Sequence, residues 1–191
     1  VPHWNSENCI QCGICASACP HAAIRTKLAE KDSLKDAPAS FNTVDAKPNA
    51  NGEQFKVQVY CEDCTGCGVC LDQCPANKNP EKQALTWSTI EKEVEACELE
   101  NEKFFDALPD NVMGRNTTKT MKGAMLRKPL FEFSGACAGC GETPYVKLVS
   151  QLFGENSIIA NATGCSSIYS GTFPTIPYTK TKEGRGPAWA N

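Results

Sequence analysis

The chain has 191 residues, 41% of them apolar, and a formal net charge of -3. This composition predicts one or two globular domains with an ordinary core, and no basic stripe suggests a nucleic-acid partner. No apolar run approaches the roughly 20 residues of a membrane span, and residues 1–15 lack the pattern of a signal peptide. We therefore expect a soluble cytoplasmic protein that binds neither nucleic acid nor membranes, and a fragment of a longer polypeptide.

Thirteen cysteines dominate the composition, and most of them fall into short regular clusters. An odd number cannot pair completely in disulfides, and clustered cysteines in a chain without a signal peptide indicate metal held by thiolates. Two segments share the spacing C-x2-C-x2-C-x3-C-P, which is typical of ferredoxins with two [4Fe–4S] clusters.

In this spacing three cysteines surround one cluster, and the fourth, followed by proline, binds the other cluster. The expected ligand sets are Cys9, Cys12, Cys15 and Cys74 for one cluster, and Cys64, Cys67, Cys70 and Cys19 for its partner. Structural zinc is the alternative, but a zinc site needs two C-x2-C pairs rather than a triplet with a trailing Cys-Pro. We expect the remaining Cys61 and Cys97 to be packed thiols.

A ferredoxin-like α+β domain is expected over residues 1–108. Residues 25–54 are polar with little periodicity, which predicts a surface loop inserted between the two motifs. The segment FKVQVY (55–60) alternates like a strand, and ALTW (84–87) is expected to pair with it in the same small sheet.

A single helix is expected after these strands. Ser88 and Glu91 have the spacing of a capping box, and the helix should run to Leu108, before a proline. Residues 109–128 show no regular pattern and predict a linker.

Residues 129–191 follow a different pattern. The segment LFEF (130–133) predicts a strand, and SIIA (157–160) predicts a second one. Between them Thr143 is expected to cap a helix that starts at Pro144 and ends at Gly154. Such a βαβ unit releases both following loops at one edge of the sheet, where open α/β folds bind their ligands.

A third cysteine group lies on these two loops, with Cys137 and Cys140 in the first and Cys165 in the second. Three thiols beside a helix N-terminus can bind a cluster or an anion. A fourth ligand is expected from outside this chain, and the less favoured alternative is that Cys61 or Cys97 supplies it.

The segments LFEFSGACAGCGETPYVKL and ATGCSSIYSGTFPTIPYT, preceded by two ferredoxin motifs, resemble the pyruvate:ferredoxin (flavodoxin) oxidoreductases, which use thiamine diphosphate. The resemblance covers most of the chain and implies that residues 129–191 begin an α/β thiamine-diphosphate-binding domain. It also implies that Cys137, Cys140 and Cys165 hold a third [4Fe–4S] cluster, and that Glu142 and Cys165 contact thiamine diphosphate.

The resemblance implies an enzyme that converts pyruvate and coenzyme A to acetyl-CoA and CO2 and passes electrons through three clusters to ferredoxin or flavodoxin. Its other expected partners are the rest of the same polypeptide and a second copy in a homodimer. The family's Mg2+ and diphosphate-binding segment is not in this chain, so the fragment alone is expected to be inactive. The alternative is a free-standing polyferredoxin without catalysis, but the βαβ unit with a third cysteine group favours the enzyme.

Overall fold

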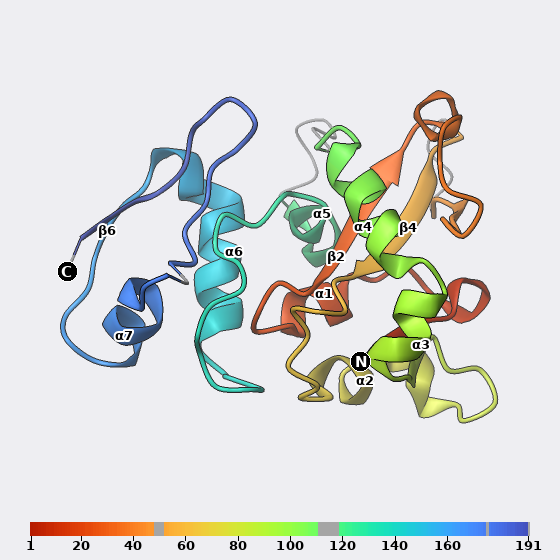
Figure 1. Ribbon diagram of the computed structural model, residues 1–191, viewed down its shortest axis with the longest axis horizontal. Helices are drawn as coiled ribbons and strands as arrows, with labels where there is room; N and C mark the ends of the chain where they lie inside the picture. Colours follow the sequence, from red (N-terminus) through yellow and green to blue (C-terminus); the bar gives the residue numbers. More distant parts are fainter. Residues whose placement is uncertain (48–51, 111–118, 175, 191) are drawn as a thin grey trace.

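The computed structural model describes residues 1–47, 52–110, 119–174 and 176–190. Figure 1 shows two parts: the segment that carries both ferredoxin motifs, and a smaller part that begins with α6 and continues to the C-terminus. No helix in the described part of the chain is both long and apolar enough to cross a membrane.

Two small antiparallel sheets organise the first part. Strand β4 (Gln54–Val59) lies between β2 (Ile24–Ala29) and β3 (Val44–Asp45). A second sheet joins β1 (Pro2–Trp4) to β5 (Leu85–Trp87). Both predicted strands are therefore confirmed, but the prediction that they pair with each other is wrong, because each pairs with a different strand.

Strand β2 corrects the prediction of a surface loop over residues 25–54. All six residues of β2 are buried, including two cations that hide its apolar alternation in the sequence. Arg25 forms an ion pair with Glu132, and Lys27 forms one with Asp110 at 3.2 Å. The same interval contains a 3-10 helix at Lys31–Leu34 and strand β3, while residues 48–51 lie outside the described residues.

The predicted helix from Ser88 to Leu108 is two helices, α3 (Ile90–Glu95) and α4 (Glu98–Ala107). Cys97 interrupts them in a left-handed conformation, with φ of 65°. The helix begins one residue later than predicted, because the side-chain oxygen of Thr89, rather than Ser88, accepts a hydrogen bond from the Lys92 N–H at 3.3 Å. Cys97 is exposed, so its predicted packing is wrong.

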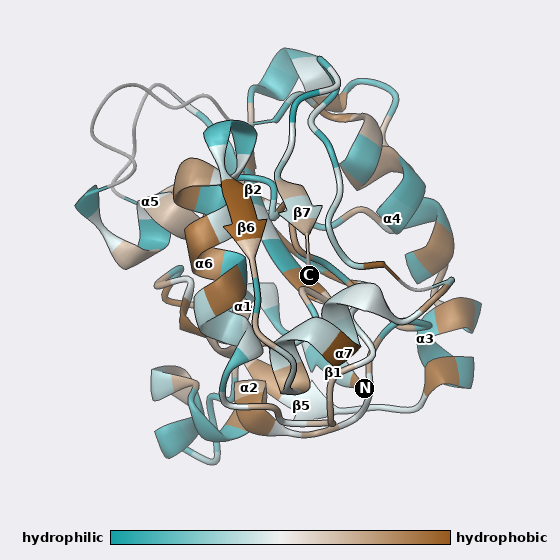
Figure 2. Ribbon diagram, turned by 90° about the vertical axis from the view of Figure 1, so that its left-hand side faces the viewer, coloured by the Kyte–Doolittle hydropathy of each residue, from teal (hydrophilic) through white to brown (hydrophobic). Residues whose placement is uncertain are grey.

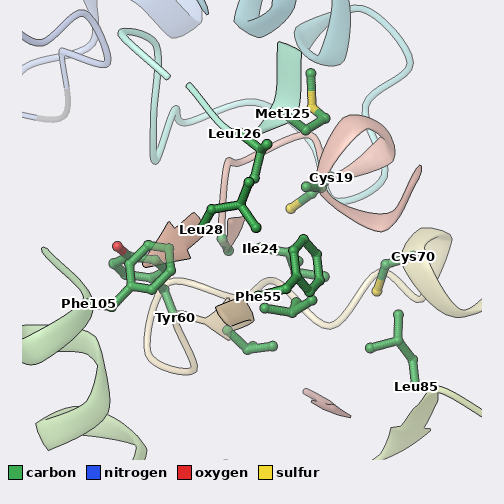
Figure 3. Packing of buried hydrophobic residues seen from close by; sticks show 14 of the residues in the cluster. Cys19, Ile24, Leu28, Phe55, Tyr60, Cys70, Leu85, Phe105, Met125 and Leu126 are labelled. Atoms are coloured by element: carbon green, nitrogen blue, oxygen red, sulfur yellow. The ribbon is translucent and has the colours of Figure 1, made fainter. Parts of the chain in front are cut away.

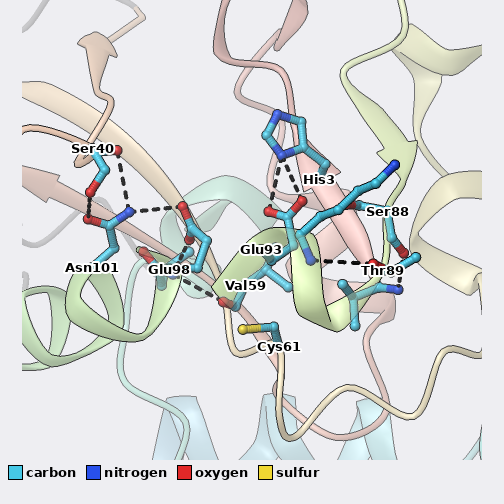
Figure 4. Close-up of polar contacts among 12 residues, drawn as sticks. His3, Ser40, Val59, Cys61, Ser88, Thr89, Glu93, Glu98 and Asn101 are labelled. Atoms are coloured by element: carbon cyan, nitrogen blue, oxygen red, sulfur yellow. Dashed lines mark hydrogen bonds and ion pairs between the residues drawn. The ribbon is translucent and has the colours of Figure 1, made fainter. Parts of the chain in front are cut away.

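Polar contacts attach these helices to the sheets, as Figure 4 shows. The imidazole of His3 in β1 lies 3.1 Å from the carboxylate of Glu93 in α3, and the side-chain amide of Gln58 in β4 donates to Glu98 in α4 at 2.7 Å. Cys61 is buried, as predicted, and its thiol lies 3.5 Å from a carboxylate oxygen of Glu102.

The predicted linker contains a helix, α5 (Met121–Met125). The hydroxyl oxygen of Thr120 caps this helix by accepting a hydrogen bond from the Gly123 N–H at 3.1 Å. Its residues 123–125 are buried against the core, which explains why a segment without a clear sequence pattern is ordered. Residues 111–118 of the predicted linker lie outside the described residues.

The C-terminal part is built on α6 (Thr143–Phe153), which ends at Gly154 as predicted and continues in a 3-10 turn. The helix begins one residue earlier than predicted, because Glu142 rather than Thr143 occupies the cap position. Strand β6 (Ile158–Ala160) is confirmed, and it pairs in parallel with β7 (Ala188–Ala190).

The predicted strand 130–133 is not formed, so the predicted βαβ unit is wrong. Only Phe131 makes an isolated bridge, to Tyr178. The reason is that Phe133 adopts a left-handed φ of 51°, which ends the extended conformation, while the Phe131 ring packs edge-on against Tyr169 and Tyr178.

A continuous apolar core underlies the cysteine motifs. Figure 3 shows Cys19 and Cys70 among buried aromatic and aliphatic side chains such as Phe55, Leu85 and Met125. The C-terminal part differs, because several of its large apolar side chains are exposed. In Figure 2 the apolar β6 lies on the face toward the viewer, and Ile158 of this strand is 86% exposed.

Candidate functional site

The two cysteine motifs fold into the same turn. In the first, the Gln11 N–H donates to Sγ of Cys9 at 3.4 Å; in the second, the Gly66 N–H donates to Sγ of Cys64 at 3.5 Å. Both donors adopt a left-handed conformation, with φ of 60° and 67°. This turn aims a backbone N–H at the first sulfur of each motif, and such hydrogen bonds stabilise thiolates.

A glycine starts a short helix in each motif. Gly13 precedes α1 (Ile14–Ala18) at φ 77°, and Gly68 precedes α2 (Val69–Asp72) at φ 78°. These helices place Cys15 and Cys70, respectively, in their first turns. The two helices lie against each other, so the third cysteine of each motif faces the same region.

The structure brings the fourth cysteine of each motif to the other motif. Burial raises the pKa of Cys9, and the charges of Cys12 and Cys74 raise it further. Cys74 therefore lies among the thiols of the first motif. This is the crossed arrangement that the spacing predicts, although the assignment of ligands stays a prediction.

The second set surrounds a hollow of about 360 Å³ of atom-free space, including its open mouth. Its four thiols are Cys19, Cys64, Cys67 and Cys70, and the rest of the lining is mostly apolar, with Ile24, Leu71 and Trp87 among it. Burial raises the pKa of Cys70 to about 12, and the charges of the other three thiols act in the same direction. A buried thiol among other thiols resists ionisation unless a cation binds it.

Thiol groups like these are the donors that iron-sulfur clusters take. Within the described residues, no group of three or more His, Cys, Asp or Glu is arranged to hold a single ion. Iron atoms lie between the sulfurs of a cubane cluster, so its ligands lie farther apart than those of one zinc ion. The thiol donors, the apolar hollow and the inward N–H groups together suit [4Fe–4S] clusters.

The third cysteine group lies at the N-terminus of α6. The Cys140 N–H donates to the Cys137 carbonyl at 3.0 Å, which closes the loop between the two thiols. Burial raises the pKa of Cys140, but hydrogen bonds from the N–H groups of Thr143 and Glu142 outweigh it, so this pKa is lowered. The helix N-terminus thus favours the thiolate of Cys140, which is the form that binds metal.

Cys165 is exposed and is the first residue of α7 (Cys165–Gly171), not part of a free loop as predicted. Tyr169 lies one turn further along α7. Burial raises the pKa of Tyr169, and the nearby charges of Glu142 and Cys140 raise it further. Helix α7 therefore lies beside the loop of the third group, and the exposed Glu142 lies between them.

Two contacts join the loop of the third group to the cysteine motifs, one at the second motif and one at His21, directly after the first motif. A Cβ atom added at Gly139 would lie 3.7 Å from Cβ of Cys67 and 3.7 Å from Cγ2 of Val69. His21 accepts a backbone hydrogen bond from Phe133 at 2.9 Å, and its Nδ1 lies 3.1 Å from the carbonyl oxygen of Ser134. Because a carbonyl only accepts, Nδ1 carries the proton.

Sequence reasoning missed His21 and Gln11, which position the cysteine loops. His21 directly follows the Cys-Pro of the first motif, a position that could have marked it. No local pattern marks Gln11, because its side chain bonds to residues more than 30 positions away.

Comparison with known proteins first defines the class. A family model described as a 4Fe-4S dicluster domain matches residues 8–78, which contain both motifs. This part of the chain is therefore an iron-sulfur domain of the two-cluster type.

Longer relatives then define the family. The chain is 54% identical to the pyruvate:ferredoxin oxidoreductase of Moorella thermoacetica, 49% to the pyruvate-flavodoxin oxidoreductase of Nostoc sp., and 47% to the probable pyruvate-flavodoxin oxidoreductase of Escherichia coli. Each match covers 100% of this chain and 16% of the relative. The chain thus belongs to the pyruvate:ferredoxin (flavodoxin) oxidoreductase family as a segment of its longer sequence.

Proposed function

We propose that this chain is the electron-transfer portion of an enzyme that oxidises pyruvate to acetyl-CoA and CO2 and reduces ferredoxin or flavodoxin. The observation that carries the proposal is the gathering of Cys19 with three thiols of the second motif around one hollow, matched by Cys74 among the thiols of the first motif. A two-cluster carrier needs this crossing, and a zinc site does not.

Three [4Fe–4S] clusters would be held, two of them by the crossed sets of four thiols. The third would be held by Cys137, Cys140 and Cys165, with a fourth ligand from the rest of the polypeptide. When bound, such clusters accept and release one electron each. Gly139 packs against Cys67, and α1 packs against α2, which supports a spatial order of third group, second motif and first motif.

The chain's own residues would bind the clusters and control their surroundings. The N–H groups of Gln11 and Gly66 stabilise negative charge on Cys9 and Cys64. Trp87 and Leu71 line the second hollow and limit the access of water to it. Limited hydration and hydrogen bonds to sulfur are the means by which a protein sets a cluster's potential.

Thiamine diphosphate and Mg2+ would be held mainly by the rest of the complete polypeptide, with Glu142 and Cys165 as contacts from this chain. The exposed Glu142 carboxylate and Cys165 thiol, on two neighbouring segments of the C-terminal part, support this assignment. The binding of pyruvate and coenzyme A, the homodimer and the cytoplasmic location belong to the proposal for the complete enzyme.

The test uses the complete polypeptide that contains this chain, purified without oxygen. We expect iron and acid-labile sulfide in equal amounts, and reduction of ferredoxin or flavodoxin that depends on pyruvate and coenzyme A. In a Cys165→Ala variant this reduction should fall by more than tenfold, whereas dithionite should still reduce the two ferredoxin-like clusters. Clusters that dithionite reduces but pyruvate does not would instead support the polyferredoxin alternative, and zinc without labile sulfide would contradict both.

A further inference from the structure

A buried lysine, Lys147, connects α6 to the helix of the first cysteine motif. Lys147 is 2% exposed. Its Nζ donates hydrogen bonds to the carbonyl oxygens of Ser17 at 3.1 Å and Cys19 at 2.7 Å, and also to that of Ala16. An ammonium group has three donors, and here all three bind the end of α1 and the residue after it.

Lys147 differs from the other buried cations of the chain in its partners. Arg25 is paired with the Glu132 carboxylate, and Lys27 is paired with Asp110. Lys56 forms no ion pair with a described carboxylate either, but its Nζ lies over the rings of Trp4 and Phe41. Among the described residues, no carboxylate forms an ion pair with Lys147. A buried charge without a counter-ion is costly, so the site requires negative charge from another source.

Two cysteines next to these carbonyls can supply negative charge, because Lys147 binds the carbonyl of Cys19 itself and that of Ala16, the residue after Cys15. The charges of Cys19 and Cys15 both act on Lys147, and they oppose the effect of burial, which lowers the pKa of Lys147 to about 8. Cys15 is a predicted ligand of one cluster and Cys19 of the other. Lys147 therefore lies beside one ligand of each predicted cluster.

We propose that Lys147 is the shared counter-charge of the two ferredoxin-like clusters, and that it raises the reduction potential of both. The inference rests on the proposed function, because it requires clusters at these cysteines. Adding an electron makes a cluster more negative, so a fixed cation nearby stabilises the reduced state more than the oxidised state. The hydrogen bonds to three carbonyls hold the cation in place, which makes Lys147 a positioning residue rather than a ligand.

Helix α6, which carries Lys147, also supports the third cysteine group at its N-terminus. The N-terminus of α6 supports Cys140 of the third group, and Lys147 lies in the second turn of the same helix. One helix thus supports the third group and supplies the charge for the other two. The ferredoxin motifs alone, residues 8–78, do not contain this charge.

The experiment is a redox titration of the complete polypeptide, followed by electron paramagnetic resonance of the reduced clusters. Lys147→Met removes the charge and the donors, and Lys147→Gln removes the charge but keeps a donor. Both should shift the two ferredoxin-like clusters to more negative midpoints, with about a tenfold lower reduced-to-oxidised ratio at a fixed potential, or about 59 mV for a one-electron couple.

Two matched variants serve as controls. Lys147→Arg keeps the charge and should shift the midpoints much less. Gln151→Met removes a different buried polar contact of α6, the 2.8 Å bond from its Nε2 to the Arg127 carbonyl, and should leave both midpoints unchanged. Gln151 lies one turn after Lys147, so it controls for loss of a docking contact without loss of charge.

The outcomes separate this inference from the proposed function. A wild-type polypeptide without reducible clusters would refute the proposed function itself. Wild-type clusters with unchanged midpoints in both Lys147→Met and Lys147→Gln would overturn only the inference. Loss of both clusters in the two variants would also overturn it, because Lys147 would then act only to hold the turn between Cys15 and Cys19.

Discussion

The two cysteine motifs share one skeleton and one turn, but different parts of the chain support them. At the left-handed position the second motif has Gly66, and a Cβ atom there would meet nothing within 4 Å. The first motif has Gln11, whose amide donates to the Asp45 carbonyl at 2.8 Å and accepts from the Lys47 N–H at 2.8 Å. The duplication thus preserves a backbone conformation, while the means of holding it differ between the copies.

The surroundings of the two motifs differ in the same way. The first motif is covered by helix α5, whose Lys122 and Met125 lie against Gly13. The second motif is covered by the ring of Trp87, which lies against Gly68 and is 59% exposed. The atom closest to a Cβ at Gly13 therefore belongs to the backbone of α5, whereas the atom closest to a Cβ at Gly68 belongs to an exposed side chain that can move.

The largest expected effect comes from removing the fourth cysteine of either motif. Cys19→Ser should remove the cluster predicted at the second motif, and Cys74→Ser should remove the cluster predicted at the first. In each variant the site loses one of its four thiolates. Iron and labile sulfide content should each fall by one cluster, and one paramagnetic signal of the reduced protein should change.

Comparing signals identifies which cluster is affected. Cys64→Ser and Cys19→Ser should alter the same signal, whereas Cys9→Ser and Cys19→Ser should alter different ones. Cys97→Ser changes an exposed thiol and should alter none. If Cys19→Ser and Cys9→Ser change one common signal, each motif closes on its own cluster.

A smaller effect should come from the left-handed turns. Gln11→Ala removes three side-chain hydrogen bonds of a residue that is 2% exposed and leaves the strained φ unchanged. We expect the lost hydrogen bonds alone to lower local stability by about 2–3 kcal/mol. Gly66→Ala adds only backbone strain, about 1–2 kcal/mol. Hydrogen exchange of the amides of residues 9–15 and 64–70 measures both effects in the intact polypeptide.

Gln11→Gly is the matched control, because it loses the same hydrogen bonds but relieves the strain. It should lose less protection from exchange than Gln11→Ala. Equal losses in the two variants would mean that the φ of Gln11 carries no strain.

Sequence predicted the cysteine groups because their spacing is local. The spacing also encodes the crossing, since the trailing Cys-Pro directs the chain away from its own motif. The structure accordingly places Cys19 in the hollow of the second motif. Helix α6 could also be predicted from the sequence, because a proline marks its start and a glycine marks its end.

Other elements could not be predicted, because distant residues determine them. Arg25 and Lys27 made β2 look like a polar loop, and their partners Glu132 and Asp110 are more than 80 positions away. The break at Cys97 carries no glycine or proline to mark it. Strand β6 pairs with a strand about 30 residues later, at Ala188–Ala190, which the βαβ pattern did not include.

The smallest effect we expect is a difference between two glycine substitutions. Gly13→Ala and Gly68→Ala both place alanine at φ of 77–78°, so their backbone strain is the same. Distance alone ranks Gly68→Ala as worse, because its Cβ would lie 3.1 Å from Cζ2 of Trp87, against 3.3 Å from Cα of Lys122 at Gly13. We expect the opposite order, by about 1 kcal/mol, because an exposed ring can move and the backbone of a packed helix cannot.

The Trp87→Leu variant separates these two explanations. Combined with Gly68→Ala, it should restore part of the protection of residues 64–70 from hydrogen exchange, since the shorter side chain no longer meets the new Cβ. Combined with Gly13→Ala, it should restore none, because Trp87 does not lie against Gly13. Trp87→Leu alone supplies the baseline for both combinations. A Gly68→Ala variant that is less protected than Gly13→Ala, and that Trp87→Leu does rescue, would show that Trp87 is held as firmly as the backbone around the first motif. If Trp87→Leu restores no protection, the contact with the Trp87 ring is not what destabilises Gly68→Ala.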